Sequence, residues 1–377
     1  MEDFIAFGKP HFGEAEIAAV TRVLESGWVG MGPETETFER ELAAYLTSPE
    51  VVAVSSCTAA LLLSLRVLGI GPGDEVICPS LTWCSTANAA LYLGAIPVFA
   101  DVRPDTLCLD PEDVARAVTP RTRAVVVVHF GGLAADVGAL SALLPSRCVL
   151  VEDAAHALGA RYPQGGLVGS SGNLCCFSFY ANKTLSTGEG GAIALPDGAD
   201  AARLRSLRQH GLESDAWQRY STRRGRISDL SELGYKANYT DLQAAIGRVQ
   251  LTRQQEFAAR RLAVAEYYAT ALDGLGLAFQ HGCTEPRHAR HLFAVRLPED
   301  SRRSRDDIVR DMREAGIGVS VHYPPLHPMP LYSGSPPRRL PVTDAVAPRL
   351  MTLPIGPLVG LGEAERVVAA LRRVVGG

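Results

Sequence analysis

Short apolar runs alternate with helical patterns along the first two thirds of the chain. The strand-length runs are Val51–Val54, Val76–Cys78, Pro97–Phe99, Ala124–Val128 and Cys148–Val151. Runs that are apolar at every position are typical of strands buried on both faces of a parallel sheet. Helical patterns such as Ala59–Leu68 and Pro111–Val118 lie between them. This repeated βα alternation predicts a doubly wound α/β domain.

The flanking segments extend this domain. Residues 14–46 predict two amphipathic helices that form an N-terminal arm. The first of them carries Ile17, Val20 and Leu24 on one face. Two further strands and a helix are expected at Leu174–Phe179, Ala192–Leu195 and Ala201–Gln209. We expect the main sheet to lie within residues 50–240.

The last third of the chain predicts a small α+β domain. A long helical pattern follows Asp241. Beyond it, a strand, a helix and a second strand are expected at Leu292–Leu297, at Arg305–Ala315 and near Val319. The chain is therefore expected to divide into residues 1–245, the arm and large domain, and residues 246–377, the long helix and small domain.

Composition and charge restrict the possible partners. The 377 residues are 47% hydrophobic and 21% charged, which is an ordinary globular composition. A formal net charge of -4 provides no positive field for a nucleic acid backbone. No run approaches the roughly 20 apolar residues of a membrane span, and residues 1–4 do not resemble a signal peptide, so we expect a cytoplasmic protein. The eight cysteines form no CxxC pair, and we expect neither a disulfide nor a zinc site.

Polar residues that directly follow strands are the candidates for chemistry, because ligands bind outside the carboxyl ends of the strands in open α/β sheets. These candidates are Ser55–Thr58, Trp83, His129, Glu152 and Asp153 with His156, and Ser178–Lys183. The segment SSCTAAL follows a strand and opens a helix. Its N–H groups and the Thr58 hydroxyl either bind a phosphate or only cap the helix.

Asp153 and Lys183 carry the strongest chemical signals. Asp153 follows an apolar strand, where a carboxylate is costly unless a cation meets it. A protonated pyridine nitrogen is such a cation, and capping of a helix is the alternative. Lys183 lies between a strand and a glycine-rich loop. A lysine amine among apolar walls can lose its proton and form an imine with an aldehyde, although most lysines are only solvated.

Several motifs, in order along the chain, resemble the DegT/DnrJ/EryC1/StrS family of sugar aminotransferases, within the fold type I pyridoxal-phosphate enzymes. They are SSCTAAL, GIGPGDEVICPSLTWCSTANA, VEDAAHALGA, FSFYANKTLSTGEGG and GYKANYTDLQAAIG. The resemblance covers nearly the whole chain. The segments PSLTW, EDAAHA, HGLESDAWQR and GYKANYTD are most similar to enzymes that aminate C4 of a nucleotide-linked 4-keto sugar. The family's fold has a large, mostly parallel sheet of the seven-stranded type and a small C-terminal domain.

The resemblance also implies roles for individual residues. Lys183 would hold pyridoxal 5'-phosphate covalently, and Asp153 would pair with its pyridine nitrogen. The other implied cofactor contacts are Trp83 on the ring, His156 with an unsettled role, and Thr58, Ala59 and Ser178 at the phosphate. Asn238 would reach the cofactor of the neighbouring subunit, which makes a homodimer the functional unit.

The implied substrates are an amino acid donor, expected to be L-glutamate, and a nucleotide-linked keto sugar. The donor would load its amine on the cofactor and the keto sugar would then receive it, which gives ping-pong kinetics. Lys183 would carry the proton between the substrate carbon and the cofactor. The residues expected to contact the sugar nucleotide are His322, Tyr323, His327, Trp217 and Lys236.

Two positions depart from the family's pattern. His156 stands where many relatives have Gln, and Cys57 stands where they often have a smaller residue. The histidines His281, His288 and His291 have a spacing that suits no common metal site, so no metal is expected.

Three alternatives differ in their chemistry. A pyridoxal-phosphate sugar dehydratase has histidine in place of the lysine, so Lys183 favours transamination. An aminotransferase for a C3-keto sugar or a keto cyclitol stays open. A nicotinamide-dependent dehydrogenase would need its glycines between a strand and a helix, whereas Gly69–Gly73 follows a helix and precedes a strand.

Overall fold

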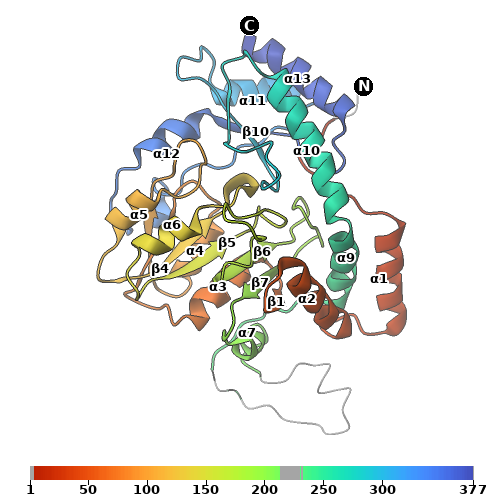
Figure 1. Cartoon of the computed structure of the whole chain (residues 1–377), viewed down its shortest axis with the longest axis vertical. Coiled ribbons are helices and arrows are strands. Elements are labelled where there is room, and N and C mark those ends of the chain that lie inside the picture. The colour runs from red at the N-terminus through yellow and green to blue at the C-terminus, as the bar shows by residue number, and fades with distance from the viewer. Residues whose placement is uncertain (1–3, 213–229, 231, 377) are drawn as a thin grey trace.

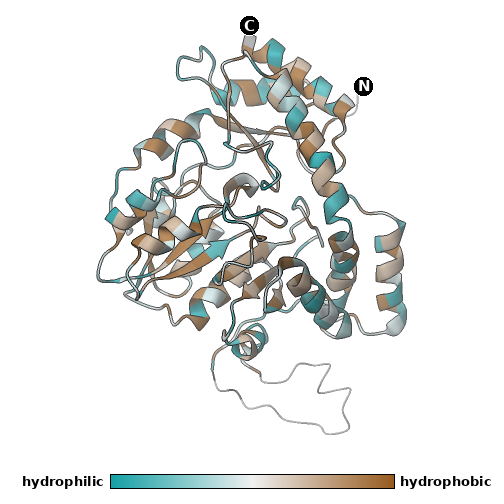
Figure 2. Ribbon diagram, viewed as in Figure 1, coloured by the Kyte–Doolittle hydropathy of each residue, from teal (hydrophilic) through white to brown (hydrophobic). Residues whose placement is uncertain are grey.

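The computed structural model describes residues 4–212, 230 and 232–376. Within them, a seven-stranded sheet forms the centre of the larger part of the molecule (Figure 1). Its strands are β1 (Glu50–Val54), β2 (Glu75–Pro79), β3 (Ile96–Ala100), β4 (Thr122–Val128), β5 (Val149–Asp153), β6 (Leu174–Ser178) and β7 (Gly191–Leu195). In Figure 2 these strands carry mostly the colours of hydrophobic residues. The apolar runs of the sequence are therefore the strands of this sheet.

The strands run in the order β1-β7-β6-β5-β4-β2-β3. Strand β7 is antiparallel to both of its neighbours, and the other neighbouring pairs are parallel. Val128 pairs with Asp153, and Asp153 pairs with Cys176. The carboxyl ends of β4, β5 and β6 therefore lie at one edge of the sheet. The predicted doubly wound, mostly parallel α/β class is confirmed.

Helices cover both faces of this sheet. They include α1 (Glu14–Ser26), α2 (Pro33–Leu46), α3 (Cys57–Val67), α4 (Ser85–Leu91), α5 (Pro111–Ala117), α6 (Val137–Leu143), α7 (Ala201–Leu207) and α9 (Asp241–Thr252). Val52 and Val54 share a core with α3 and α7, whereas Val51 and Ala53 share one with α2 and α9. Consecutive strand residues point to opposite faces, so burial on both faces explains the uniformly apolar runs.

The remaining elements form a smaller unit with an antiparallel three-stranded sheet in the order β10-β9-β8. Its elements are α10 (Gln254–Ala271), β8 (Ala278–Phe279), β9 (Phe293–Arg296), α11 (Arg305–Glu314), β10 (Leu350–Leu353) and α13 (Leu361–Gly376). Helix α12 (Pro341–Val346) joins it to the large sheet, because Val346 packs in a core with β2, β3 and β4 as well as with β9 and β10. Short 3-10 turns occur at Phe130–Gly132, Pro330–Tyr332 and Ala347–Arg349. Helices α10, α11 and α13 share one core with β9 and β10.

The division of the chain at position 245 stays a prediction, and that position lies within α9. Helices α9 and α10 run consecutively from the flank of the large sheet to the small one (Figure 1). Among the helices of the described residues, none has both the length and the apolar character needed to cross a bilayer.

The predicted strand near Val319 is wrong. The chain makes only two isolated bridges there, between Ile317 and Ile5 and between Ser320 and Thr352 of β10. Val319 is buried in the core of the small unit. Its apolar character therefore reflects packing and not a place in a sheet.

Helix α1 buries a different face from the one its apolar residues suggest. Ile17 and Leu24 are 66% and 57% exposed, whereas Glu16, Ala19 and Val23 are buried. The Glu16 carboxylate accepts a hydrogen bond from Gln250 of α9 and forms an ion pair with Arg253. The same side of α1 packs Ala19 and Val23 against Ala245 of α9, so Ile17 and Leu24 face solvent in a single chain.

Gly191, at the start of β7, allows the loop after β1 to approach the sheet. A Cβ added at Gly191 would lie 2.5 Å from the carbonyl carbon of Ser56 and 2.6 Å from the nitrogen of Cys57. These are backbone atoms at the N-terminus of α3, so they cannot rotate away. The position of this helix N-terminus depends on the absence of a side chain at residue 191.

We expect Gly191→Ala to lower the free energy of unfolding by about 1–3 kcal/mol, because overpacking against backbone forces a shift of the loop. Gly71→Ala is the matched control, since an added Cβ there meets nothing within 4 Å. Urea unfolding of both variants measures the difference. Equal midpoints for the two variants would contradict the close approach at Gly191.

Candidate active site

A cavity of about 480 Å³ opens at the carboxyl edge of the large sheet. The large domain contributes Ser56, Cys57, Thr58, Thr82, Trp83, Ser85, Val128, Asp153, Ala155, His156, Ser178, Tyr180, Asn182, Lys183, Glu189 and Gly190. The smaller unit contributes His291, His322 and Tyr323. The cavity therefore brings together most of the side chains selected from the sequence.

Lys183 lies in the turn that follows β6. Its backbone N–H donates to the Tyr180 carbonyl oxygen at 2.9 Å. Its Nζ atom lies 3.3 Å from Nε2 of His291. Burial among the cavity walls lowers the pKa of Lys183 from 10.5 to about 8, although the nearby Cys57 and Asp153 act in the opposite direction. Roughly a tenth of this amine is therefore neutral and nucleophilic at pH 7, far more than for an ordinary lysine.

Asp153 ends β5 and is 4% exposed. Its Oδ2 atom accepts from the Thr86 hydroxyl at 2.8 Å, and Oδ1 accepts from the Ala155 N–H at 3.2 Å. The Cys57 thiol lies 3.9 Å from Oδ1. Burial raises the pKa of Asp153 despite the hydrogen bonds from Thr86 and Ala155. No Lys, Arg or His of the described residues forms an ion pair with this carboxylate, so it can pair with a cation bound in the cavity.

A buried polar network holds the end of β5 in place. Glu152 accepts from His129 Nε2 at 2.7 Å, from the Tyr162 hydroxyl at 2.7 Å, and from Asn173 and Ser171. His129, Glu152 and Cys175 approach one another as metal ligands could. The hydrogen bonds already occupy the lone pairs of the Glu152 carboxylate, which makes the cluster a support for Asp153.

The N-terminus of α3 forms one end of the cavity. Ser56 caps this helix, and its Oγ atom accepts from the Ala59 N–H at 3.1 Å. Thr58 lines the cavity together with Ser178, which ends β6. Free N–H groups and hydroxyls at a helix N-terminus suit a phosphate. Ala59 does not line the cavity, and its N–H is used by the cap.

His156 and Tyr323 form a fixed pair in the cavity wall. Nδ1 of His156 accepts from the Gly131 N–H at 3.3 Å, and Nε2 lies 2.8 Å from the Tyr323 hydroxyl. Because Nδ1 is an acceptor, the ring proton of neutral His156 is on Nε2 and is donated to the tyrosine oxygen. Burial lowers the pKa of His156 well below its ordinary value, and the charge of Lys183 acts in the same direction.

Trp83 and His322 line the cavity as well. Trp83 is 60% exposed, and its ring lies 5.9 Å from that of Tyr323. His322 bonds Thr352 through Nδ1 at 2.9 Å, and burial followed by the charge of Lys183 lowers its pKa to about 3. His327 lies outside the cavity, with its Nδ1 atom 2.8 Å from the Ser80 hydroxyl.

Lys236 and Asn238 do not line the cavity of their own chain. Lys236 is exposed and donates to the Asn238 side-chain oxygen at 2.7 Å. Asn238 in turn donates to Gln209 at 3.2 Å. Trp217, the other residue expected at the substrate, lies outside the described residues.

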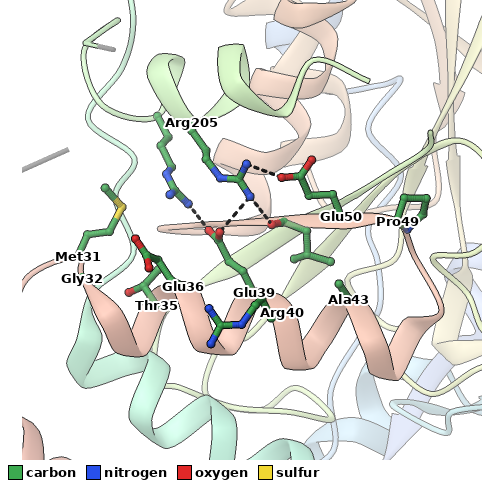
Figure 3. Close-up of a pocket in the computed structure, with 12 residues that line it drawn as sticks. Met31, Gly32, Thr35, Glu36, Glu39, Arg40, Ala43, Pro49, Glu50 and Arg205 are labelled. Carbon is green, nitrogen blue, oxygen red and sulfur yellow. Dashed lines mark hydrogen bonds and ion pairs between the residues drawn. The ribbon is translucent and has the colours of Figure 1, made fainter. Parts of the chain in front are cut away.

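A second cavity, of about 380 Å³, lies beside α2, β1 and α7 (Figure 3). Four of its charged side chains, Glu39, Glu50, Arg205 and Arg208, already pair with one another. Arg205 contacts Glu39 at 3.3 Å and Glu50 at 2.5 Å, and Arg208 contacts Glu39 at 2.5 Å. This cavity therefore offers fewer free groups for chemistry than the one around Lys183.

The whole chain matches one protein family. The sequence profile described as the DegT/DnrJ/EryC1/StrS aminotransferase family covers residues 10–372. The chain belongs to this family.

Similar proteins and solved structures agree with this assignment. The spore coat polysaccharide biosynthesis protein SpsC of Bacillus subtilis (strain 168) is 42% identical over 383 residues, which cover 99% of this chain and 98% of SpsC. The sugar aminotransferase Spr1654 from Streptococcus pneumoniae, in its PMP-form, superposes with a TM-score of 0.92 at 31% identity over 99% of both chains. DesV of S. venezuelae, in complex with a ketimine intermediate, gives a TM-score of 0.85 at 39% identity and covers 95% of this chain and 93% of DesV.

The protein is thus a sugar aminotransferase that depends on pyridoxal phosphate. A second structure of Spr1654, in its PLP-form, agrees with this cofactor. The cavity of this family member fits the cofactor. Lys183 offers an amine of lowered pKa for the aldehyde, and Asp153 offers a buried carboxylate that forms no ion pair within the part of the chain that the structure describes. The N-terminus of α3 offers N–H groups for the phosphate.

Sequence reasoning missed His291 as a candidate for this site. The candidates from the sequence were polar residues at the ends of strands in the large domain, whereas His291 precedes β9 of the smaller unit. Of the histidines near it, His288 is buried and bonds Gln280 at 3.0 Å, and His281 lies near Glu285. The sequence showed only a histidine next to a predicted strand. It lies 108 positions from Lys183, and no local pattern indicates that the two residues meet.

We expect the reactivity of Lys183 in the cofactor-free protein to rise with pH and to reach half its maximum near pH 8, because the neutral amine is the nucleophile. Reductive methylation at a series of pH values, followed by peptide mass spectrometry, measures this profile. A midpoint close to the ordinary lysine value of 10.5 would show that burial does not lower the pKa of Lys183.

Proposed function

We propose that the protein transfers the amino group of L-glutamate to C4 of a nucleotide-linked keto sugar, with Lys183 and Asp153 at the reacting centre. The presence of these two side chains in one cavity carries the proposal. The segments PSLTW, EDAAHA and GYKANYTD, which resemble C4-aminating enzymes, support the position of attack.

Different residues of the cavity would bind different parts of the cofactor. When bound, pyridoxal phosphate supplies an aldehyde that takes up amino groups and a ring that accepts electrons from a deprotonated carbon. Asp153 would hold a proton on the pyridine nitrogen, since its buried carboxylate gains a cationic partner there. Thr58, Ser178 and the N-terminus of α3 would bind the phosphate. Trp83 would pack on the ring, with His156 on the wall beside it.

Lys183 has two tasks in this proposal. Its amine holds the cofactor when no substrate is present. After an incoming amine displaces it, Nζ is free to take the proton from the substrate carbon that bears the nitrogen. The lowered pKa of Lys183 suits this exchange, because a neutral amine accepts a proton and an ammonium does not.

The outer part of the cavity would receive the sugar nucleotide. Trp83 and Tyr180 line the cavity and are 60% and 48% exposed. Exposed aromatic faces at a cavity bind flat apolar surfaces of ligands. His322 and the Tyr323 hydroxyl add polar groups on the side of the smaller unit.

We propose that the functional unit is a homodimer in which Asn238 and Lys236 contribute to the cavity of the partner chain. In a single chain these residues do not line the cavity. The exposed Ile17 and Leu24 of α1 are apolar side chains that a second copy would cover. A twofold interface buries the same surface on both chains, so each copy would complete the other's site.

Mixing two inactive variants tests the shared site. Lys183→Ala removes the amine from one chain, and Asn238→Asp places a negative charge against the partner's phosphate. A mixed dimer has one site with both changes and one site with neither, so unfolding and refolding an equal mixture should restore about a quarter of the wild-type rate. Each variant refolded alone is the control. No recovery in a mixture that forms dimers would contradict the sharing.

The substrate is tested with the cofactor-loaded protein, L-glutamate and a panel of nucleotide-linked keto sugars. We expect a new amine at C4, located by mass spectrometry and NMR. Amination at C3, or of a keto cyclitol alone, would overturn the substrate assignment while leaving the aminotransferase family intact.

A further inference from the structure

His291 is the side chain that contacts the Lys183 amine most directly. Its Nε2 atom lies 3.3 Å from Lys183 Nζ, and its side chain is 5% exposed. It precedes β9, so the smaller unit supplies it across the cavity from the turn that carries the lysine. The two residues are 108 positions apart in the chain.

The ring of His291 rests on a second imidazole whose orientation is fixed. The rings of His291 and His156 are 4.7 Å apart and inclined by 33°. His156 is held at both nitrogens, by the Gly131 N–H and by the Tyr323 hydroxyl. A ring with both nitrogens bonded does not rotate freely, so it forms a firm support for His291.

His291 carries no charge in this environment. The groups that face it from the surrounding elements are Lys183, His156, His322 and Arg261. The charges of Lys183 and Arg261 favour the neutral imidazole of His291, and protonated His156 or His322 would act in the same direction. Burial is the largest cause, and together they lower the pKa of His291 well below its ordinary value. Arg261 of α10 is buried, donates to the Thr184 carbonyl oxygen at 3.4 Å and forms no ion pair within the described residues.

A neutral imidazole has one nitrogen that only accepts hydrogen bonds. Lys183 brings N–H donors to Nε2 in both of its protonation states. An Nε2 atom that accepts hydrogen bonds can therefore bind an N–H of the lysine ammonium. It can equally bind an N–H of the neutral amine, whose nitrogen lone pair then stays free. If Nε2 carried the proton, it would instead donate to that lone pair and block the attack on a carbonyl.

We propose that His291 is a positioning residue for Lys183, whose Nε2 accepts an N–H of the lysine amine and leaves its lone pair directed at a carbonyl in the cavity. The inference rests on the proposed role of Lys183 as the nucleophile. His291 takes no proton in this role and acts only through the lysine.

The chain allows a direct test, because Lys9, Lys183 and Lys236 are its only lysines. The cofactor-free protein is methylated with formaldehyde and cyanoborohydride at pH 8, and peptide mass spectrometry follows each lysine. His291→Phe removes the acceptor but fills the space. We expect it to slow methylation of Lys183 roughly five- to tenfold, the value of one hydrogen bond, while the exposed Lys9 reacts as before.

Two further variants separate positioning from folding. His291→Gln keeps an acceptor oxygen, and we expect it to restore Lys183 methylation to within about twofold of wild type. His291→Leu replaces the phenylalanine variant if thermal unfolding shows that the latter does not fold. His281→Gln is the matched control, because His281 does not line the cavity.

The outcomes distinguish this inference from the proposed function. Equal methylation of Lys183 in wild type and in the variants without an acceptor overturns the role of His291. So does a glutamine variant that is as slow as the phenylalanine variant. A wild-type protein that develops no visible absorbance band with pyridoxal phosphate contradicts the role of Lys183 itself.

Discussion

The rest of this site depends on a carboxylate that is buried at the end of a central strand and has no ion-pair partner among the described residues. Asp153 is held by the Thr86 hydroxyl and the Ala155 N–H, yet burial still raises its pKa. A bound cation would therefore gain a strong partner there. The Glu152 network and the ladders to β4 and β6 keep the carboxylate in place. The fold thus fixes a negative group at the floor of a cavity before any ligand arrives.

The same cavity has the opposite effect on Lys183. Burial disfavours the charged form of both groups, so it raises the pKa of the carboxyl group and lowers that of the amine. Perturbed groups of opposite type within one cavity are a common mark of catalytic sites. In this chain they stand beside a helix N-terminus that suits a phosphate. One cavity therefore presents a group for each end of pyridoxal phosphate.

Much of the large domain could be predicted because its strands are buried on both faces. The runs at Val51–Val54 and Ala124–Val128 are apolar at each position and are strands. Asp153 and Lys183 were recognisable because Asp153 ends β5 and Lys183 lies in the turn that follows β6. The prediction of a strand near Val319 failed, since a buried valine outside a sheet has the same local pattern as one in a strand.

The features of the site and the fold that could not be predicted from the sequence depend on contacts between distant segments. His291 reaches Lys183 only because the smaller unit folds back over the sheet edge, and no local pattern encodes that distance. The buried face of α1 was also hidden, because Glu16 is buried through its bonds to Gln250 and Arg253. Ala59 lies in the right motif, but the Ser56 cap uses its N–H.

The central claim is that the nitrogen of Lys183 binds the cofactor covalently. Borohydride reduction of the cofactor-loaded protein, followed by digestion and mass spectrometry, tests it directly, because the chain has only Lys9 and Lys236 as competing lysine side chains. The account predicts a phosphopyridoxyl mass on the peptide that contains Lys183 and on neither of the others. A Lys183 peptide without that mass, or the mass on another lysine, would contradict it.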